Sequence, residues 1–302
     1  IELALDLNHQ PRIFDYYNHG IVDLGAFEYQ GTPLFPIRYV KKDGKGNGTS
    51  WGNASGSLQA MINAKDVEQV WVAEGTYISE NDGWKLKSNV TVLGGFQNLG
   101  NPTLNARNWN LYPTVLSGNN EKRIFYHPGI LVNEEYQDST EVIVIDSTAV
   151  LDGFVLTQGY SGENGGAMYN QFASPTLRNL KFTNNHSVEN GAAIYNLVSR
   201  PKISNSSFSN NTADNYGGAI ANEYFSEIKV FNTVFSGNNA LIGSVYSSSD
   251  TSKLILVNST LTGNISSQNT GALFSYGEGS TTEVYNSILF NNGKNVLDSL
   301  DA

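Results

Sequence analysis

Short runs of alternating apolar and polar residues, separated by Gly, Asn and Ser, fill the second half of the chain. The run from Thr176 to Phe182 is one example. Alternation with period two is typical of strands that bury one face. No amphipathic helical stretch separates these runs, so the pattern indicates an all-β fold built from short strands and tight turns.

Two motifs repeat together along this part of the chain. The first begins with glycine and reads GGAMYN at 165–170, GAAIYN at 191–196, GGAIAN at 217–222, GSVYSS from Gly243 and GALFSY from Gly271. Its small residue falls at Ala167, Ala193, Ala219, Ser244 and Ala272, with spacings of 26, 26, 25 and 28. The second motif is Phe or Leu followed three residues later by Asn185, Asn211, Asn238, Asn264 or Asn292. Two motifs that keep one period indicate a repeat architecture.

The repeat length selects the architecture. A propeller blade needs about 40 residues, and leucine-rich and ankyrin repeats need helices, so neither fits. A rung of short parallel strands fits, because stacked rungs about 4.8 Å apart pair each backbone with the layer below. We therefore predict a right-handed parallel β-helix over 37–302, with irregular first rungs over 70–150 and regular rungs over 151–302.

In such a stack, equivalent residues form ladders along the axis. Phe182, Phe208 and Phe235 are expected to stack inside, as are Met168, Ile194, Ile220, Val245 and Leu273. The repeated glycines supply turn conformations that a Cβ forbids. The repeated asparagines are expected at turns, where Asn tolerates left-handed geometry and its amide bonds along the stack.

The residues before the first rungs predict a cap. Over 57–68, Leu58, Met61, Ile62 and Val67 share one helical face, and Ser57 is a suitable N-cap. A short helix there would cover the open end of the stack, whose edge would otherwise be unpaired. The stretch 97–113 has few periodic apolar residues and is expected to be a loop.

Composition narrows the partners. The chain has 28 acidic and 18 basic residues, a net charge of −10, and no cysteine. The chain lacks the cationic surface that nucleic acid or anionic lipid requires. The absence of cysteine excludes disulfides and thiolate metal sites. No segment is long enough for a membrane-spanning helix, and no signal peptide is visible at the N-terminus.

The opening of the stack resembles a known family. RYVKKDGKGNGTSWGNASGSLQAMINA (38–64), VWVAEGTY (70–77) and VLGGF (92–96) are similar to the start of right-handed β-helix proteins on bacterial surfaces, especially in Bacteroidetes. The paired glycine and Phe-x-x-Asn motifs resemble repeats of polymorphic outer-membrane proteins and autotransporter-like adhesins. The resemblance implies export and an extracellular or bacterial cell-surface location.

The first residues resemble a different part of the same kind of module. DLNHQPRIFDYYNHGIVDLGAFEYQ, within 1–36, is similar to the closing segment that normally follows a last rung. This tail suggests either tandem modules or a fragment cut across a junction. The end of the chain at Ala302, without a closing segment of its own, favours the fragment.

Enzymatic β-helices define what catalysis would require. A lyase needs a basic residue to take a proton, often beside Ca²⁺, and a hydrolase needs converging carboxylates. The candidates are Asp146 and Asp152, six residues apart, with Lys202 and Lys229 at equivalent places in neighbouring rungs. The four histidines (His9, His19, His127, His186) are scattered and suggest no metal set. Structural roles are the simpler interpretation of all these residues.

A carboxylate stack is the candidate metal site. Glu163 and Glu189 are 26 residues apart, and Asp214 is nearby in the next rung. Ca²⁺ is the cation that such a stack would take, but no loop has the dense acidic spacing of a calcium motif. Exposed turn carboxylates without a cofactor are therefore the expected interpretation.

An aromatic stripe is the candidate binding site. If the ladder that begins with Met168 points inward, strand alternation turns the residues that follow its members outward. These outward residues include Tyr169, Tyr195, Tyr246 and Phe274. Such rings can stack on sugars or on a protein partner; alternatively, they stack on each other or lie under a loop. We predict a non-enzymatic surface scaffold or adhesin that binds a glycan or a host or bacterial surface protein. The alternatives are a carbohydrate-active enzyme for acidic polysaccharide and a pure spacer.

Overall fold

The computed structural model describes residues 36–129, 144–293 and 297–299 of the chain. Contacts divide the chain into Ile1–Pro36 and Ile37–Ala302. The predicted closing-segment tail over 1–36, with His9 and His19, lies outside the described residues except for Pro36.

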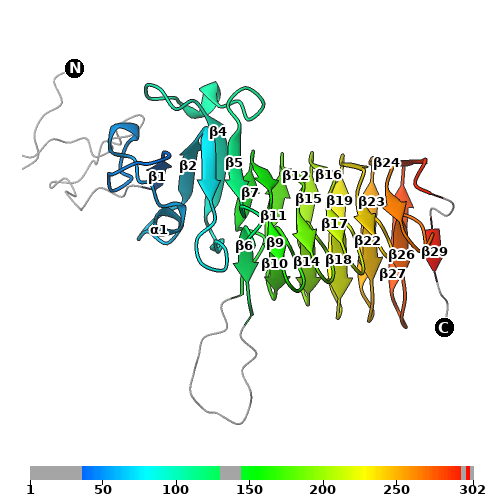
Figure 1. Ribbon diagram of the computed structural model, residues 1–302. Helices are drawn as coiled ribbons and strands as arrows, with labels where there is room; N and C mark the ends of the chain where they lie inside the picture. Colours follow the sequence, from blue (N-terminus) through cyan, green and yellow to red (C-terminus); the bar gives the residue numbers. More distant parts are fainter. Residues whose placement is uncertain (1–35, 130–143, 294–296, 300–302) are drawn as a thin grey trace, which may run out of the picture. The chain divides into compact units, whose positions relative to one another are not determined.

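From Ile37 onward the described chain is a parallel β-helix, as predicted (Figure 1). Each regular rung contributes one strand to each of four parallel sheets, which we number I to IV in chain order. Sheet I contains β1 (Ile37–Val40), β2 (Gln69–Ala73), β4 (Thr91–Phe96), β7 (Val150–Asp152), β11 (Thr176–Arg178), β15 (Lys202–Ser204), β19 (Glu227–Phe231), β23 (Lys253–Val257) and β27 (Thr281–Tyr285). Sheet II contains β3 (Gly75–Ile78), β5 (Thr114–Ser117), β8 (Val155–Thr157), β12 (Lys181–Thr183), β16 (Ser207–Ser209), β20 (Val234–Ser236), β24 (Thr260–Thr262) and β28 (Ile288–Phe290).

The other two sheets complete each rung. Sheet III contains β9 (Tyr160–Ser161), β13 (His186–Ser187), β17 (Thr212–Ala213), β21 (Asn239–Ala240) and β25 (Ile265–Ser266). Sheet IV contains β6 (Phe125–His127), β10 (Met168–Gln171), β14 (Ile194–Leu197), β18 (Ile220–Glu223), β22 (Tyr246–Ser248), β26 (Leu273–Ser275) and β29 (Leu297–Ser299). Because every pairing is parallel, each rung covers the edge of the one before it.

The phenylalanine ladder forms inside sheet II, as predicted. The rings of Phe182 and Phe208 stack at 4.6 Å with planes 4° apart, and those of Phe208 and Phe235 at 4.8 Å and 13°. All three are fully buried. The stack continues through Leu156 on one side and Leu261 on the other.

The asparagine ladder is also inside, which corrects one part of its prediction. Asn185, Asn211, Asn238 and Asn264 each donate their Nδ2 to the Oδ1 of the next asparagine at 2.7–2.9 Å. The predicted amide stack is therefore confirmed. Left-handed geometry, however, belongs to the preceding residue, for example Asn184 at φ 55° and Asn210 at φ 54°. The turn is made by that residue, and the amide points into the core.

As predicted, a helix covers the open end of the first rungs, but it is shorter than the predicted range 57–68. Helix α1 (Leu58–Ile62) begins at Ser57, whose hydroxyl accepts a hydrogen bond from the Ala60 N–H. Leu58, Met61 and Ile62 join the main core. The 3-10 turn η1 (Trp51–Asn53) places Trp51 in a separate cluster with Tyr39, Trp71 and Phe96. The predicted loop 97–113 is irregular apart from a second 3-10 turn, η2 (Leu104–Ala106).

Candidate functional site

The outward row of sheet IV carries a partial aromatic ladder. Tyr126, Tyr169 and Tyr195 lie in register on β6, β10 and β14, with ring centroids 5.3 Å apart at each step. The Arg123 guanidinium lies over Tyr126 at 4.9 Å and over Tyr169 at 5.4 Å. Tyr195 is only 3% exposed and Phe274 only 5%, whereas Tyr169 is half-buried. Of the four predicted binding residues, Tyr169 alone presents much of its ring to solvent.

Tyr246 corrects the predicted ladder. It pairs with Ile220 and Leu273 in the inward row and is 1% exposed. Its hydroxyl accepts a hydrogen bond from Asn222 Nδ2 at 3.2 Å, and burial raises its pKa. The prediction paired Val245 with Ile220, which is one residue out of register. Ser247 therefore takes the outward place between Ala221 and Phe274.

A half-buried carboxylate lies beside the tyrosine row. The Tyr195 hydroxyl donates to Glu223 Oε2 at 2.6 Å, and Asn190 Nδ2 donates to Oε1 at 3.2 Å. Burial, with the negative charges of Asp250 and Glu189, raises the pKa of Glu223. The flank of sheet IV is therefore acidic as well as aromatic.

Apolar side chains, three of them exposed and Phe172 half-buried, mark the corner between sheets IV and I. Phe172, Val198 and Tyr224 directly follow the paired strands β10, β14 and β18, and Phe225 follows Tyr224. All four have positive φ, between 49° and 58°. Tyr224 is 52% exposed, Phe225 60% and Val198 38%. We call these four residues the apolar corner.

The rest of the molecule shows how unusual this corner is. At the corner between sheets I and II, the left-handed position of the first regular rung is Gly153, and in the following rungs it is Asn179, Asn205, Asn232, Asn258 and Asn286. A left-handed conformation costs an ordinary residue roughly 1–2 kcal/mol, which Asn and Gly largely avoid. Bulky exposed residues in such positions are a feature from which a functional role can be inferred. The sequence offered one signal, namely Tyr-Phe where the next rung has Asp250-Thr251 and the corner between sheets I and II has Asn or Gly.

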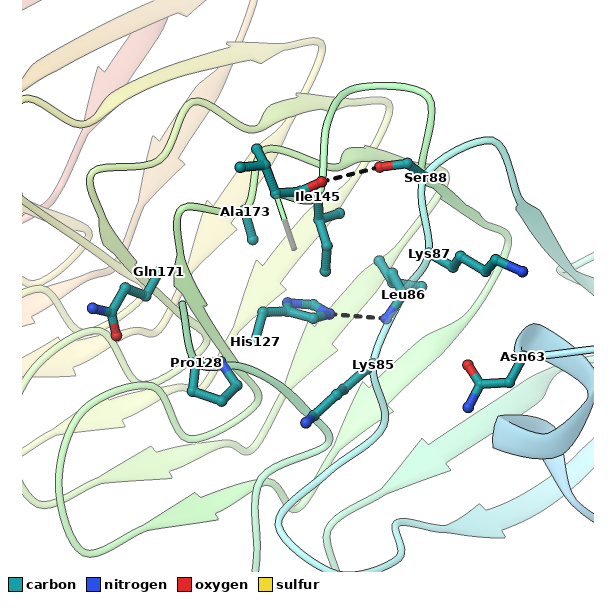
Figure 2. Close-up of a pocket in the computed structure, with 11 residues that line it drawn as sticks. Asn63, Lys85, Leu86, Lys87, Ser88, His127, Pro128, Ile145, Gln171 and Ala173 are labelled. Carbon is teal, nitrogen blue, oxygen red and sulfur yellow. Dashed lines mark hydrogen bonds between the residues drawn. The ribbon is translucent and has the colours of Figure 1, made fainter. Parts of the chain in front are cut away.

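A separate pocket lies between the first rungs and the regular stack (Figure 2). Its volume is about 550 Å³. The lining is largely apolar and consists of Asn63, Lys85, Leu86, Lys87, Ser88, His127, Pro128, Val144, Ile145, Gln171 and Ala173. The repeat pattern does not indicate this pocket, because its residues come from irregular segments far apart in the chain.

His127 is buried in the wall of this pocket. Its Nε2 accepts a hydrogen bond from the Leu86 N–H at 3.0 Å, and its Nδ1 lies 2.8 Å from Asn170 Oδ1 (Figure 2 shows the first). This arrangement requires a neutral ring with its proton on Nδ1. Burial, aided by the nearby charge of Lys85, lowers the pKa of His127 to about 4 although the Asn170 hydrogen bond opposes this.

His127 should make folding stability depend on pH. Its pKa is about 4 when folded and 6.5 when exposed, so between these values the unfolded chain binds more protons. We expect this contribution to be complete above pH 6.5 and to fall by roughly 3 kcal/mol as pH drops to 4. Denaturant unfolding at a series of pH values measures it. His127→Asn should reduce the slope by this amount, and His186→Asn, a control at a half-buried histidine that contacts Asp214, should keep it; a slope lost with His186 instead would contradict the assignment.

The predicted catalytic residues do not form a common site. Asp146 is exposed, and hydrogen bonds from Thr148 lower its pKa. Asp152 is buried and bound to Arg107 at 2.7 Å and Arg178 at 2.6 Å. Burial raises its pKa, but hydrogen bonds from Arg107, Asn179 and Arg178 outweigh burial and leave it lowered. Asp152 therefore has a structural role, since it forms ion pairs with both Arg107 and Arg178.

The two lysines lie at equivalent places in neighbouring rungs, whereas the backbone ladder through Glu163 and Glu189 continues to Asn215 and not to Asp214. Lys202 and Lys229 pair in register on sheet I; Lys202 lies over Phe231, and Lys229 bonds Glu227 at 3.0 Å. The backbones of Glu163 and Glu189 are hydrogen-bonded in adjacent rungs. Glu163 pairs with Arg123, and Asp214 with His186. Within the described residues, no three His, Cys, Asp or Glu side chains lie close enough to hold a metal ion.

Comparison with known families gives one finding. Residues 179–197 and 205–223 match the Chlamydia polymorphic membrane protein repeat. The matched segments contain Phe182 with Asn185 and Phe208 with Asn211, which lie in the core ladders above. Searches of curated proteins and of solved structures give no significant match.

The fold and the two matches together identify a surface β-helix repeat protein, with repeats similar to those of polymorphic membrane proteins. The family description assigns the matched repeats to a membrane protein of Chlamydia. No helix among the described residues is long and apolar enough to cross a membrane.

Proposed function

We propose that this chain is a non-enzymatic extracellular module that binds a glycan or a surface protein through the flank of sheet IV and the apolar corner. The observation that carries the proposal is the pair Tyr224 and Phe225, exposed in left-handed conformations that glycine or asparagine would adopt more cheaply. Residues kept in strained, exposed positions are explained by contact with a partner.

The surroundings of the corner support a binding role. Tyr169 and the Arg123 guanidinium lie on the same flank, and Glu223 offers a carboxylate beside the Tyr195 hydroxyl. Aromatic rings supply apolar contact area and the polar groups supply direction, a combination common in recognition surfaces. Tyr169, Tyr195 and Glu223 lie on paired strands of the stack, so these side chains need little ordering on binding.

Binding of the full chain to a panel of glycans and immobilised surface proteins tests the proposal. Tyr224→Asn with Phe225→Asn should weaken the strongest interaction at least about tenfold, as loss of aromatic anchors does. The same double variant should be more stable in denaturant unfolding, because Asn accepts the left-handed conformation. A packing role predicts the opposite change in stability.

The matched control is Tyr285→Ser, which removes an aromatic ring that is 54% exposed on β27 of sheet I. This variant should bind like the unmodified chain. Assays for new reducing or unsaturated ends should stay negative with every glycan. Turnover of any glycan, or full binding by the corner variant, would count against the proposal.

A further inference from the structure

We propose that the pocket of Figure 2 binds an amphipathic anion, that is, a small molecule with an apolar body and one anionic head group. The inference is independent of the adhesin role, since the pocket and the apolar corner share no residue.

The walls fit an apolar body. Leu86, Ile145 and Ala173 are nearly fully buried members of the main core that also border the cavity. Pro128 and the exposed Val144 extend this apolar lining. A volume of about 550 Å³ lies within the range of small-molecule sites.

The charges of the pocket select an anion. Lys85 and Lys87 flank Leu86 on one segment (Figure 2), and the eleven lining residues include no carboxylate. In the described part of the chain, neither ammonium group makes an ion pair or a side-chain hydrogen bond. One oxygen of the neighbouring Asp146 carboxylate, Oδ1, accepts hydrogen bonds from the backbone N–H and the hydroxyl of Thr148. Two unpaired lysines beside an apolar pocket are notable in a chain of net charge −10.

Several of the remaining polar groups already have partners within the protein, whereas the amide groups of Asn63 and Gln171 can add neutral donors. Both ring nitrogens of His127 are engaged, by Leu86 N and Asn170 Oδ1. Asn63 accepts from Gln59 Nε2 at 3.1 Å, and Ser88 Oγ accepts from Asp146 N at 3.1 Å. A flexible ammonium acts as a point charge that reaches a carboxylate or phosphate without fixed geometry. The head group is therefore defined by its charge more than by its shape.

Calorimetric titration of the full chain with octanoate, octanol and inorganic phosphate tests the inference. Octanoate should bind at one site per chain, octanol at least about tenfold more weakly, and phosphate not measurably. Rising salt should weaken octanoate binding and leave octanol binding unchanged. The variant Lys85→Met with Lys87→Met keeps the apolar stems and should bind octanoate only as weakly as octanol.

The control variant removes the same amount of charge elsewhere. Lys181→Met with Lys202→Met alters two exposed lysines outside the pocket and should leave octanoate affinity unchanged. Binding to vesicles of phosphatidylglycerol is compared with binding to vesicles of phosphatidylcholine. Selective binding to phosphatidylglycerol that needs Lys85 and Lys87 would show that the anion is a lipid. Absence of such binding, with octanoate bound, would show that it is a free amphiphile. Failure of octanoate to bind, equal affinity for octanol, or unchanged binding in the Lys85/Lys87 variant would overturn the proposal.

Discussion

Replacement of Asn211 by leucine is expected to lower the free energy of unfolding by at least about 4 kcal/mol. The Asn211 side chain lies inside the stack and makes four hydrogen bonds. Its Oδ1 accepts from the backbone N–H of Asn185 at 3.2 Å and from Asn185 Nδ2 at 2.8 Å. Its Nδ2 donates to the Phe182 carbonyl at 3.1 Å and to Asn238 Oδ1 at 2.9 Å.

Leucine removes the side-chain partner of the buried Asn185 N–H and Phe182 carbonyl, and it takes one of two partners from Asn185 Nδ2 and Asn238 Oδ1. Each unpaired buried group costs about 1–3 kcal/mol, which the gain in apolar burial offsets only in part. Denaturant unfolding of the full chain measures the cost. Asn205→Gly is the control, because Asn205 is exposed in the same rung at φ 51° and glycine keeps that conformation; it should cost less than about 1 kcal/mol. Equal costs for the two variants would show that the buried ladder adds no stability.

This ladder illustrates why the fold could be predicted from the sequence. Phe208 and Asn211 recur with one period because each rung buries its residues only against its neighbours. A repeated sequence therefore reports contacts between residues about 26 positions apart, which a single strand pattern does not. The cap followed equally from local chemistry, since Ser57 and the apolar face of the next residues define a helix start.

Register within a rung was harder to predict. The motif beginning at Gly243 has serine and valine where earlier rungs have Gly218 and Ala219, so alignment on small residues slipped by one. In a strand, a one-residue slip turns every side chain to the other face. This slip placed Tyr246 outside although its ring completes the core.

The candidate sites were harder to predict from the sequence for three physical reasons. The exposure of Tyr224 and Phe225 depends on a left-handed turn, which an apolar-polar pattern does not encode. The pocket around His127 joins non-repeating segments, so no period points to it. Tyr195 was correctly placed on the outward row, but its burial depends on neighbours such as Glu223 that the repeat does not specify.

Replacement of Asp152 by alanine is the second change expected to have a large effect, with a cost of about 3–5 kcal/mol. Asp152 and the Arg107 side chain are both nearly fully buried, and Arg107 Nη2 lies 2.7 Å from Asp152 Oδ1. Arg107 also donates from Nη2 to the Asp152 carbonyl at 2.6 Å and from Nε to the Gly94 carbonyl at 2.5 Å. Arginine remains charged, so loss of the carboxylate leaves a buried, uncompensated cation.

Arg107 belongs to the loop 97–113, so the consequence should be local before it is global. Without Asp152 the loop loses its main charged attachment to sheet I, and limited proteolysis should cut it faster than in the unmodified chain. Arg178→Ala is the control, because Arg178 is 45% exposed and contributes an ion pair of little net value. We expect that variant to lose no more than about 1 kcal/mol and to keep the loop protected. If both variants behave alike, the buried pair between Arg107 and Asp152 does not fasten the loop, and the stacked rungs alone hold it in place.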